Sequence, residues 1–288
     1  MRVSASSEET VSLKSDPAER LQDAPATSCE LTVHRWRDGE ISRVRDHVAE
    51  EVPIALTYHG VPHVVMLATP SDLEDLAVGF TLSESIVADR SEIQSVEAVQ
   101  RDDGALEVRI GVVAERFSEL LRRQRNLTGR TGCGLCGAQT VEDAIRQPPP
   151  VKSGIQFDVK ALHQVMKDLQ GWQAINSLTG SVHAAAWVLP ESGIQLVRED
   201  VGRHNALDKV IGAVTRADGD FSVGYFVVTS RASYEMVQKA VTAGATLLVA
   251  VSAPTAFAVR LAEATGLTLV GFAREHQHVV YAHPSRLI

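Results

Sequence analysis

Hydrophobic and polar positions in the second half of the chain predict alternating strands and helices. Short apolar runs bounded by turn residues predict strands, and the stretches between them have the spacing of helices. Strands are expected at 184–189, 195–198, 223–229, 246–251 and 268–272, and helices at 204–214, 233–243 and 255–264. This order contains a β-α-β-α-β series, typical of an α/β domain. Because the strands are continuously apolar, we expect a central mixed sheet covered by helices.

The first half has a different pattern, which predicts a smaller α+β subdomain. Gly60 lies between two apolar runs and Gly104 between two others, and glycine at these places favours turns that join strand pairs. Ser71 followed by Glu74 predicts a capping box at the start of a helix. Strands are expected at 54–58, 64–68, 93–99 and 106–112, and helices at 71–86 and 115–124.

Polar and proline-rich segments set the expected boundaries. Residues 1–28 are rich in Ser, Glu, Asp and Ala, and we expect a disordered tail because little apolar surface there offsets the entropy of ordering. Pro148-Pro149-Pro150 predicts a stiff break, after which Asp158 is expected to cap a helix that reaches Leu169. We therefore expect an α+β subdomain at 29–150 and an α/β domain at 151–288.

Composition narrows the class of protein. The chain has 288 residues, 44% of them hydrophobic, which is enough for a sizeable core. Its formal charge of −8 argues against nucleic acid as a partner but leaves room for a local basic pocket. No apolar run of about 18 residues is present to span a bilayer, and no signal peptide begins the sequence. Three cysteines fit a reducing compartment, so we expect a cytoplasmic protein without a membrane partner.

Two of the cysteines, Cys133 and Cys136, lie in the loop Thr-Gly-Cys-Gly-Leu-Cys-Gly. Such a pair can serve in a structural zinc site, a thioredoxin-type redox couple or a sulfur carrier. Structural zinc needs two further ligands at similar spacing, and the sequence has no second pair, so no metal is expected. A thioredoxin-type couple normally follows a strand directly and opens a helix, a context that this loop lacks. A sulfur carrier needs a mobile thiolate near positive charge, which the arginines at 122, 123, 125 and 130 supply. The chemistry of the residues alone does not separate the carrier from the redox couple.

Polar residues follow two predicted strands of the second half and predict an anion-binding site. Residues 198–209 and 229–233 each lie at a strand-to-helix junction, where unpaired backbone N–H groups favour anions. Arg203 and Arg231 are the candidate phosphate ligands, with His204 beside them. Helix capping and a buried ion-pair network are the alternative use of the same residues.

The order of elements in the second half matches that of zinc deaminases without their catalytic groups. A deaminase helix opens with His-x-Glu and is followed by a Cys-x-x-Cys pair. Here the corresponding positions read His204-Asn205-Ala206 and Ser230-Arg231-Ala232-Ser233. Because the general acid/base and both thiolates are missing, we expect a deaminase-like scaffold whose former metal pocket serves binding.

The chain resembles the formate dehydrogenase accessory sulfurtransferase family (FdhD) from about Glu51 to Leu287. The matching blocks are 68–80, the cysteine loop at 133–137, 179–186, 199–209, 230–237, 252–255 and 267–272. The resemblance implies a homodimeric cytoplasmic protein with a cytidine-deaminase-like domain. It also implies that the protein receives sulfur from a cysteine desulfurase and delivers it to the bis-molybdopterin guanine dinucleotide form of the molybdenum cofactor. The recipient enzyme that the resemblance implies is the apo formate dehydrogenase catalytic subunit.

The same resemblance implies roles for particular residues. Cys133 corresponds to the persulfide-bearing cysteine and Cys136 to its partner. The segment Phe272-Ala273-Arg274-Glu275-His276-Gln277 falls where the family contacts the cofactor, although it lacks the Pro-Gly that family members often carry there. A second hypothesis is a non-catalytic chaperone that binds the cofactor and formate dehydrogenase without moving sulfur.

Overall fold

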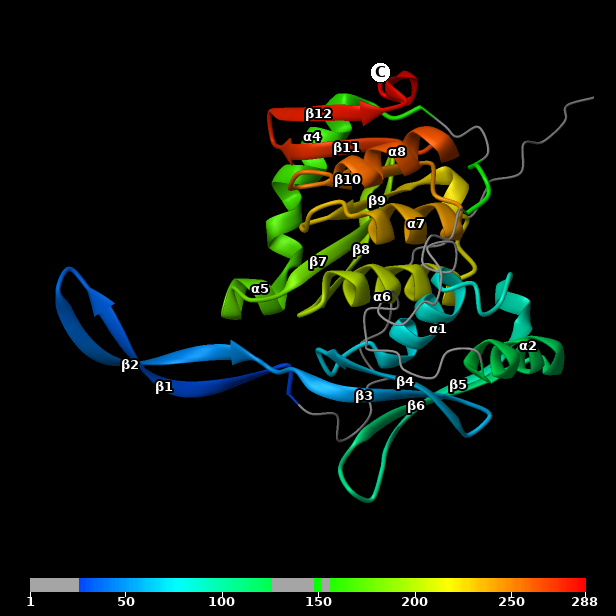
Figure 1. Cartoon of the computed structure of the whole chain (residues 1–288). Coiled ribbons are helices and arrows are strands. Elements are labelled where there is room, and N and C mark those ends of the chain that lie inside the picture. Colours follow the sequence, from blue (N-terminus) through cyan, green and yellow to red (C-terminus); the bar gives the residue numbers. More distant parts are fainter. Residues whose placement is uncertain (1–25, 126–147, 152–155) are drawn as a thin grey trace, which may run out of the picture.

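The structure is a computed structural model that describes residues 26–125, 148–151 and 156–288 (Figure 1). Its described residues form three β-sheets and seven α-helices, a mixed α/β fold. The cysteine loop and residues 1–25 of the predicted tail lie outside the described residues. Among the described residues, no helix is both long enough and apolar enough to cross a membrane.

The second half contains a six-stranded sheet with the order β12-β11-β10-β9-β7-β8. Its strands are β7 (His183–Leu189), β8 (Gly193–Asp200), β9 (Tyr225–Val228), β10 (Leu247–Ala250), β11 (Thr268–Arg274) and β12 (Gln277–Ala282). β9, β10 and β11 run parallel, while β7 pairs antiparallel with both β8 and β9. β12 was not predicted. It pairs antiparallel with β11, which extends past Phe272 to Arg274 and turns back at Glu275 and His276.

Helices cover both faces of this sheet, as the apolar strands predicted. On one face α6 (Arg203–Arg216), α7 (Tyr234–Ala243) and α8 (Ala256–Thr265) pack against Trp187, Phe226 and Leu248. On the other face α4 (Val159–Asp168) packs Leu162 and Val165 against strand residues such as Val249. Asp158 caps α4 by accepting a 2.7 Å hydrogen bond from the backbone N–H of Lys160, as predicted.

The first half contains a four-stranded sheet with the order β4-β3-β6-β5. Its strands are β3 (Val52–Tyr58), β4 (Val61–Ala68), β5 (Ile93–Gln100) and β6 (Leu106–Val112), close to the predicted ranges. It has its own core with α1 (Leu73–Ser83) and α2 (Ala114–Arg125). The remaining helices are α5 (Ala174–Thr179) and the short 3-10 helices η1 (Arg90–Glu92), η2 (Leu169–Trp172), η3 (Phe221–Val223) and η4 (Pro284–Arg286).

The predicted capping box at the start of α1 is wrong. Asp72 is the N-cap residue, in a left-handed conformation with φ 52°, and its side chain makes no capping bond. Glu74 instead lies 2.7 Å from Arg216, and Asp72 lies 3.4 Å from Arg198. The two carboxylates therefore pair with the second half of the chain, and α1 ends at Ser83 instead of about Ile86.

A two-stranded arm precedes the four-stranded sheet and was missed in the sequence. β1 (Ser28–Arg37) pairs antiparallel with β2 (Glu40–Ala49) through a turn at Asp38-Gly39. Figure 1 shows this arm projecting away from the two larger sheets. Ser28, which was assigned to the predicted tail, is therefore the first residue of β1. Most side chains of the arm are exposed on both faces, so its strands lack the period-two burial that identifies a half-buried strand.

Helices α1 and α6 cross at very short range and join the two halves. A Cβ atom on Gly79 would lie 1.7 Å from the carbonyl oxygen of Asp208, and one on Gly212 would lie 1.8 Å from that of Asp75. Only glycine at both positions permits this approach. Lys239 of α7 adds a buried ion pair, 2.9 Å from Asp208. The start of α6 is thereby held against the large sheet and the helix of the first half at once.

Candidate functional site

Predicted site residues from three separate stretches of sequence lie at one edge of the six-stranded sheet. The carboxyl ends of β8, β9, β10 and β11 meet there, together with the start of β7. Arg203 and His204 follow β8, Arg231 follows β9, and the segment 272–277 contains the end of β11. Open α/β sheets bind ligands at this edge.

Backbone hydrogen bonds connect the loops of this edge. The N–H of Thr255 donates to the carbonyl of Ala232 at 3.0 Å, which ties the loop after β10 to the loop after β9. The N–H of Phe272 donates to the carbonyl of Ser252 at 3.3 Å, which ties β11 to the same loop. The guanidinium of Arg274 donates to the carbonyls of Val251 and Ala273. The segment 272–277 is therefore held against the loop after β10. That loop is in turn hydrogen-bonded to the loop that contains Arg231.

The segment 272–277 presents most, but not all, of its side chains to solvent. Phe272 has a left-handed backbone with φ 51°, which is unusual for a bulky residue and marks a strained position, and its ring is 42% exposed. Ala273 is fully buried in the core, so it offers no exposed surface to a ligand. Glu275 lies 3.4 Å from Lys167 of α4. His276 and Gln277 are exposed.

The capping and ion-pair alternative accounts for most of the polar residues at 199–209. Asp200 and Lys209 are fully buried 2.7 Å apart, and Asp200 also accepts a bond from the backbone N–H of Thr69. Glu199 accepts 2.8 Å hydrogen bonds from the first backbone N–H groups of α5. Asp208 pairs with Lys239. These groups hold the junction in place and leave Arg203 and His204 for a ligand.

Arg203 and His204 belong to a cluster of four titratable side chains. The Nε2 atom of His204 lies 2.8 Å from Oε2 of Glu235 in α7, and this contact lowers the pKa of Glu235. Burial lowers the pKa of His183, and the charges of Arg203 and His204 add to that effect. Buried Nε of Arg203 has no hydrogen-bond partner among the described residues.

Ser233 adds a second unsatisfied group to the same edge. It is the N-cap residue of α7, as expected, but its hydroxyl makes no capping bond, and buried Oγ has no hydrogen-bond partner in the described part of the chain. The hydroxyl of Ser230 does not cap the helix either, because it donates to the carbonyl of Arg231 at 3.0 Å. Buried polar groups are normally satisfied, so free donors beside arginines point to a bound anion.

Two members of the cluster, His183 and Glu235, were given no role from the sequence. Both lie within the blocks that carry the family resemblance, His183 at the start of β7 and Glu235 in the first turn of α7. The sequence did offer one signal for a role in the site: His183 immediately precedes a predicted strand and Glu235 lies at the start of a predicted helix. Their pairing with His204 and Arg203 depends on the order of strands in the sheet, which the sequence does not specify.

The cysteine part of the predicted site lies outside the described residues, so Cys133 and Cys136 remain predictions. Of the arginines expected to assist them, Arg122 and Arg123 are exposed and donate to the backbone carbonyls of Ser118 and Ser85. No group of three or more His, Cys, Asp or Glu side chains in the described ranges is placed to hold a metal ion.

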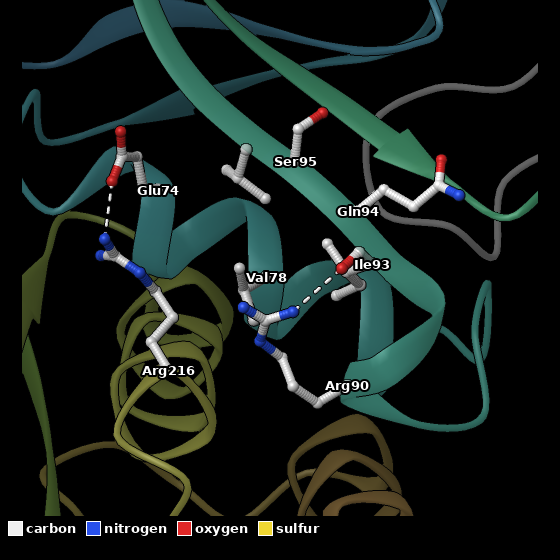
Figure 2. Close-up of a pocket in the computed structure, with 8 residues that line it drawn as sticks. Glu74, Val78, Arg90, Ile93, Gln94, Ser95 and Arg216 are labelled. Carbon is white, nitrogen blue, oxygen red and sulfur yellow. Dashed lines mark hydrogen bonds and ion pairs between the residues drawn. The ribbon is translucent and has the colours of Figure 1, made fainter.

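A cavity of about 240 Å³ lies at the far end of α6 from this cluster. Figure 2 shows Arg216 and Arg90 at its walls, with Glu74 and Ser95 nearby. The guanidinium of Arg216 is paired with Glu74 and Asp75 at 2.7 Å each. None of the predicted site residues lines this cavity, and its Arg216 is paired with carboxylates, so we place the candidate site at the sheet edge instead.

The fold is that of a mixed α/β protein, and its candidate site is a cluster of arginine and histidine side chains at the carboxyl ends of the strands. The family model described as the FdhD/NarQ family matches residues 49–288. The chain belongs to the FdhD/NarQ family.

Relatives that are similar in sequence support this family assignment, and a solved structure has the same fold. The chain is 51% identical over 271 residues to the sulfur carrier protein FdhD of Cupriavidus necator, covering 94% of each chain. It is 53% identical over 256 residues to the protein of the same name from Xanthomonas euvesicatoria, covering 89% of this chain and 91% of the relative. The crystal structure of a putative formate dehydrogenase accessory protein from Desulfotalea psychrophila has the same fold, with a TM-score of 0.71, 20% identity, and coverage of 91% of this chain and all of that one.

Proposed function

We propose that the protein is a sulfur carrier that moves sulfur from a cysteine desulfurase, through a persulfide on Cys133, to the molybdenum cofactor of formate dehydrogenase. The observation that supports it most is the cationic sheet edge, where Arg203 and Ser233 keep buried donors without partners in the described residues. The relatives named sulfur carrier protein FdhD, at 51–53% identity over about nine tenths of the chain, support sulfur transfer as the chemistry.

Sulfur loading is an exchange at divalent sulfur. The Cys133 thiolate attacks the outer sulfur of the persulfide on the desulfurase, a new S–S bond forms at Cys133, and the desulfurase cysteine leaves as a thiolate. The step consumes no external oxidant or reductant. A lowered thiol pKa favours it, because the thiolate is the nucleophile.

Sulfur release gives Cys136 a role. Its thiolate attacks the inner sulfur of the Cys133 persulfide and forms a Cys133–Cys136 disulfide, and the outer sulfur leaves as hydrosulfide with uptake of one proton. That hydrosulfide would then replace an oxygen ligand of the acceptor's molybdenum, which leaves as hydroxide, without a change in oxidation state. A cellular thiol reductant restores the two cysteines.

The acceptor substrate, bis-molybdopterin guanine dinucleotide, is proposed to bind at the sheet edge. Its diphosphates need charge-assisted donors, for which Arg203, His204 and Arg231 are suited, together with the N-terminus of α6. Exposed Phe272 offers a flat apolar surface to a guanine or pterin ring. Residues 274–277 follow Phe272 and are exposed, so they are open to the same ligand. On this reading the scaffold is deaminase-like and its pocket binds the acceptor.

The proposed partners are a cysteine desulfurase, the apo formate dehydrogenase catalytic subunit and a second copy of the chain, in the cytoplasm. All three follow from the family resemblance and are open to direct pull-down and sedimentation measurements.

Loading is tested by incubating the protein with a cysteine desulfurase and cysteine and measuring its intact mass. The wild-type protein and Cys136→Ala should each gain about 32 Da, the mass of one sulfur atom, and Cys133→Ala should not. An unchanged wild-type mass, or an equal gain in Cys133→Ala, would contradict the proposal.

The chaperone hypothesis predicts a different result. A chaperone that only binds cofactor and apoenzyme would still activate formate dehydrogenase in cells when both cysteines are replaced. The carrier predicts that a Cys133→Ala/Cys136→Ala variant produced at normal level gives no active enzyme.

A further inference from the structure

The β1–β2 arm is an unusual element because it has no third strand. It is a two-stranded sheet whose strands have ten residues each, and neither outer edge is paired within the described residues. A lone hairpin is marginally stable in water and normally needs a further strand or a packed face. Unpaired edges and exposed apolar side chains make such an arm an attachment surface.

The tip of the arm is apolar. Trp36 is 70% exposed and Ile41 is 55% exposed, and the two are direct cross-strand partners, so they lie on the same face. Cross-strand partners that are both large and apolar form a contiguous patch. Nothing else in the described chain covers them.

A second apolar patch lies near the base of the arm. Helix α5 packs against β2, and Figure 1 shows it beside the end of β2 that joins the body. Leu178 of α5 is 50% exposed, and Trp172 of the preceding η2 is 47% exposed. The chain therefore carries apolar side chains at both ends of an arm that is about 33 Å long at the usual rise per residue.

Charge does not oppose contact between two arms. The chain has a formal charge of −8, which makes most faces of two copies repel one another. The arm is an exception because its cationic and anionic residues are equal in number. They are Arg35, Arg37, Arg43 and Arg45 against Glu30, Asp38, Glu40 and Asp46.

We propose that two copies of the chain exchange arms, so that Trp36 and Ile41 of each copy pack on the Leu178 patch of the other. Two arms placed antiparallel about a two-fold axis bring the tip of each to the base of its neighbour, and both apolar patches are then covered by one self-complementary interface. This inference rests on the homodimer in the proposed function and assigns its contact surface.

Sedimentation velocity of the full chain over a range of concentrations tests the proposal. Trp36→Glu and Leu178→Lys should each raise the dissociation constant of the dimer by at least about thirtyfold, as expected when a central aromatic contact is lost. The double variant should dimerise more tightly than the two single effects combined predict, because the introduced carboxylate of one copy then meets the introduced ammonium group of the other. Val65→Glu is the matched control: Val65 of β4 is 60% exposed and outside the proposed interface, so this variant should remain a dimer.

The possible results distinguish the arm interface from the homodimer itself and from sulfur loading. A dimer that neither single variant weakens, or that Val65→Glu weakens equally, overturns the arm as the interface and leaves the homodimer standing. A wild-type protein that stays monomeric throughout overturns both, but does not bear on sulfur loading at Cys133. Circular dichroism confirms that each variant is folded, and Trp36→Ser replaces Trp36→Glu if it is not.

Discussion

At the residue scale, the cluster at the start of α6 divides its polar groups into two kinds. Asp200 and Lys209 are fully buried and pair only with protein groups, so they hold the junction between β8 and α6. Arg203 and His204 lie nearer the surface, and one donor of Arg203 is buried without a partner in the described residues. Residues that stabilise the junction and residues that remain available to a ligand are thus neighbours in one motif. For this reason the sequence was compatible both with an anion-binding site and with a buried ion-pair network.

Replacing Arg203 is predicted to weaken binding of the acceptor. Guanosine diphosphate serves as the probe, since the cofactor contains that fragment. Arg203→Gln should raise the dissociation constant about tenfold to a hundredfold, because a charge-assisted hydrogen bond to a phosphate is lost. Calorimetry measures it, with Arg122→Gln as the control because Arg122 is exposed on α2. Equal affinities for wild type and Arg203→Gln would remove Arg203 from the site.

Protonation of His183 is predicted to make stability depend on pH. Its pKa in the folded protein lies below the ordinary value of 6.5, mainly because of burial, so the unfolded chain binds more protons between the two values. Stability should therefore fall as pH decreases below 6.5. His183→Gln should lose less stability than wild type between pH 7.5 and 5.5 in denaturant titrations. An identical pH dependence in the two proteins would contradict this assignment.

At the element scale, the crossing of α1 and α6 sets the position of the site. Both helices carry a glycine where the other's backbone approaches, and a side chain at either position would have to push the helices apart. Since α6 begins with Arg203, a shift at the crossing would move the cluster with it.

Gly212→Ala is predicted to destabilise the protein by about 2–4 kcal/mol, because its Cβ would overlap the backbone of α1, which cannot move without disturbing the core. Gly171→Ala is the control: no atom lies within 4 Å of its added Cβ, so stability should change little. Chemical denaturation measures both. A Gly212→Ala variant as stable as wild type would show that the helices separate more easily than the structure indicates.

Sequence patterns predicted the elements whose burial is one-sided or complete and missed those that depend on distant partners. Apart from β12, the strands of both larger sheets were predicted, as were helices α6, α7 and α8, because their apolar positions follow a clear pattern. The capping box failed because Glu74 pairs with Arg216, more than a hundred positions away in the chain. The arm was missed although Asp38-Gly39 is a hairpin turn signal, since its strands have no buried face. The positions of Arg203, His204 and Arg231 were predicted, whereas Glu235 required the sheet order.

At the scale of the whole molecule, the chain combines an acidic surface with a cationic sheet edge. A net charge of −8 disfavours nonspecific polyanions, while the donors at one sheet edge are proposed to bind a phosphorylated ligand. The cysteine loop belongs, in sequence, between the two halves whose helices cross near that edge. The account therefore requires one molecule to do two things in order: accept sulfur on Cys133, then pass it to a ligand bound by the second half.

The most direct test of that order is a chase with radiolabelled sulfur. The protein is loaded by a cysteine desulfurase with labelled cysteine, separated from the desulfurase, and mixed with apo formate dehydrogenase that contains the molybdenum cofactor. The account predicts that label leaves the carrier and appears on the cofactor as enzyme activity rises, and that Arg203→Gln slows the transfer without slowing the loading. Label that stays on the carrier while the enzyme becomes active would contradict it.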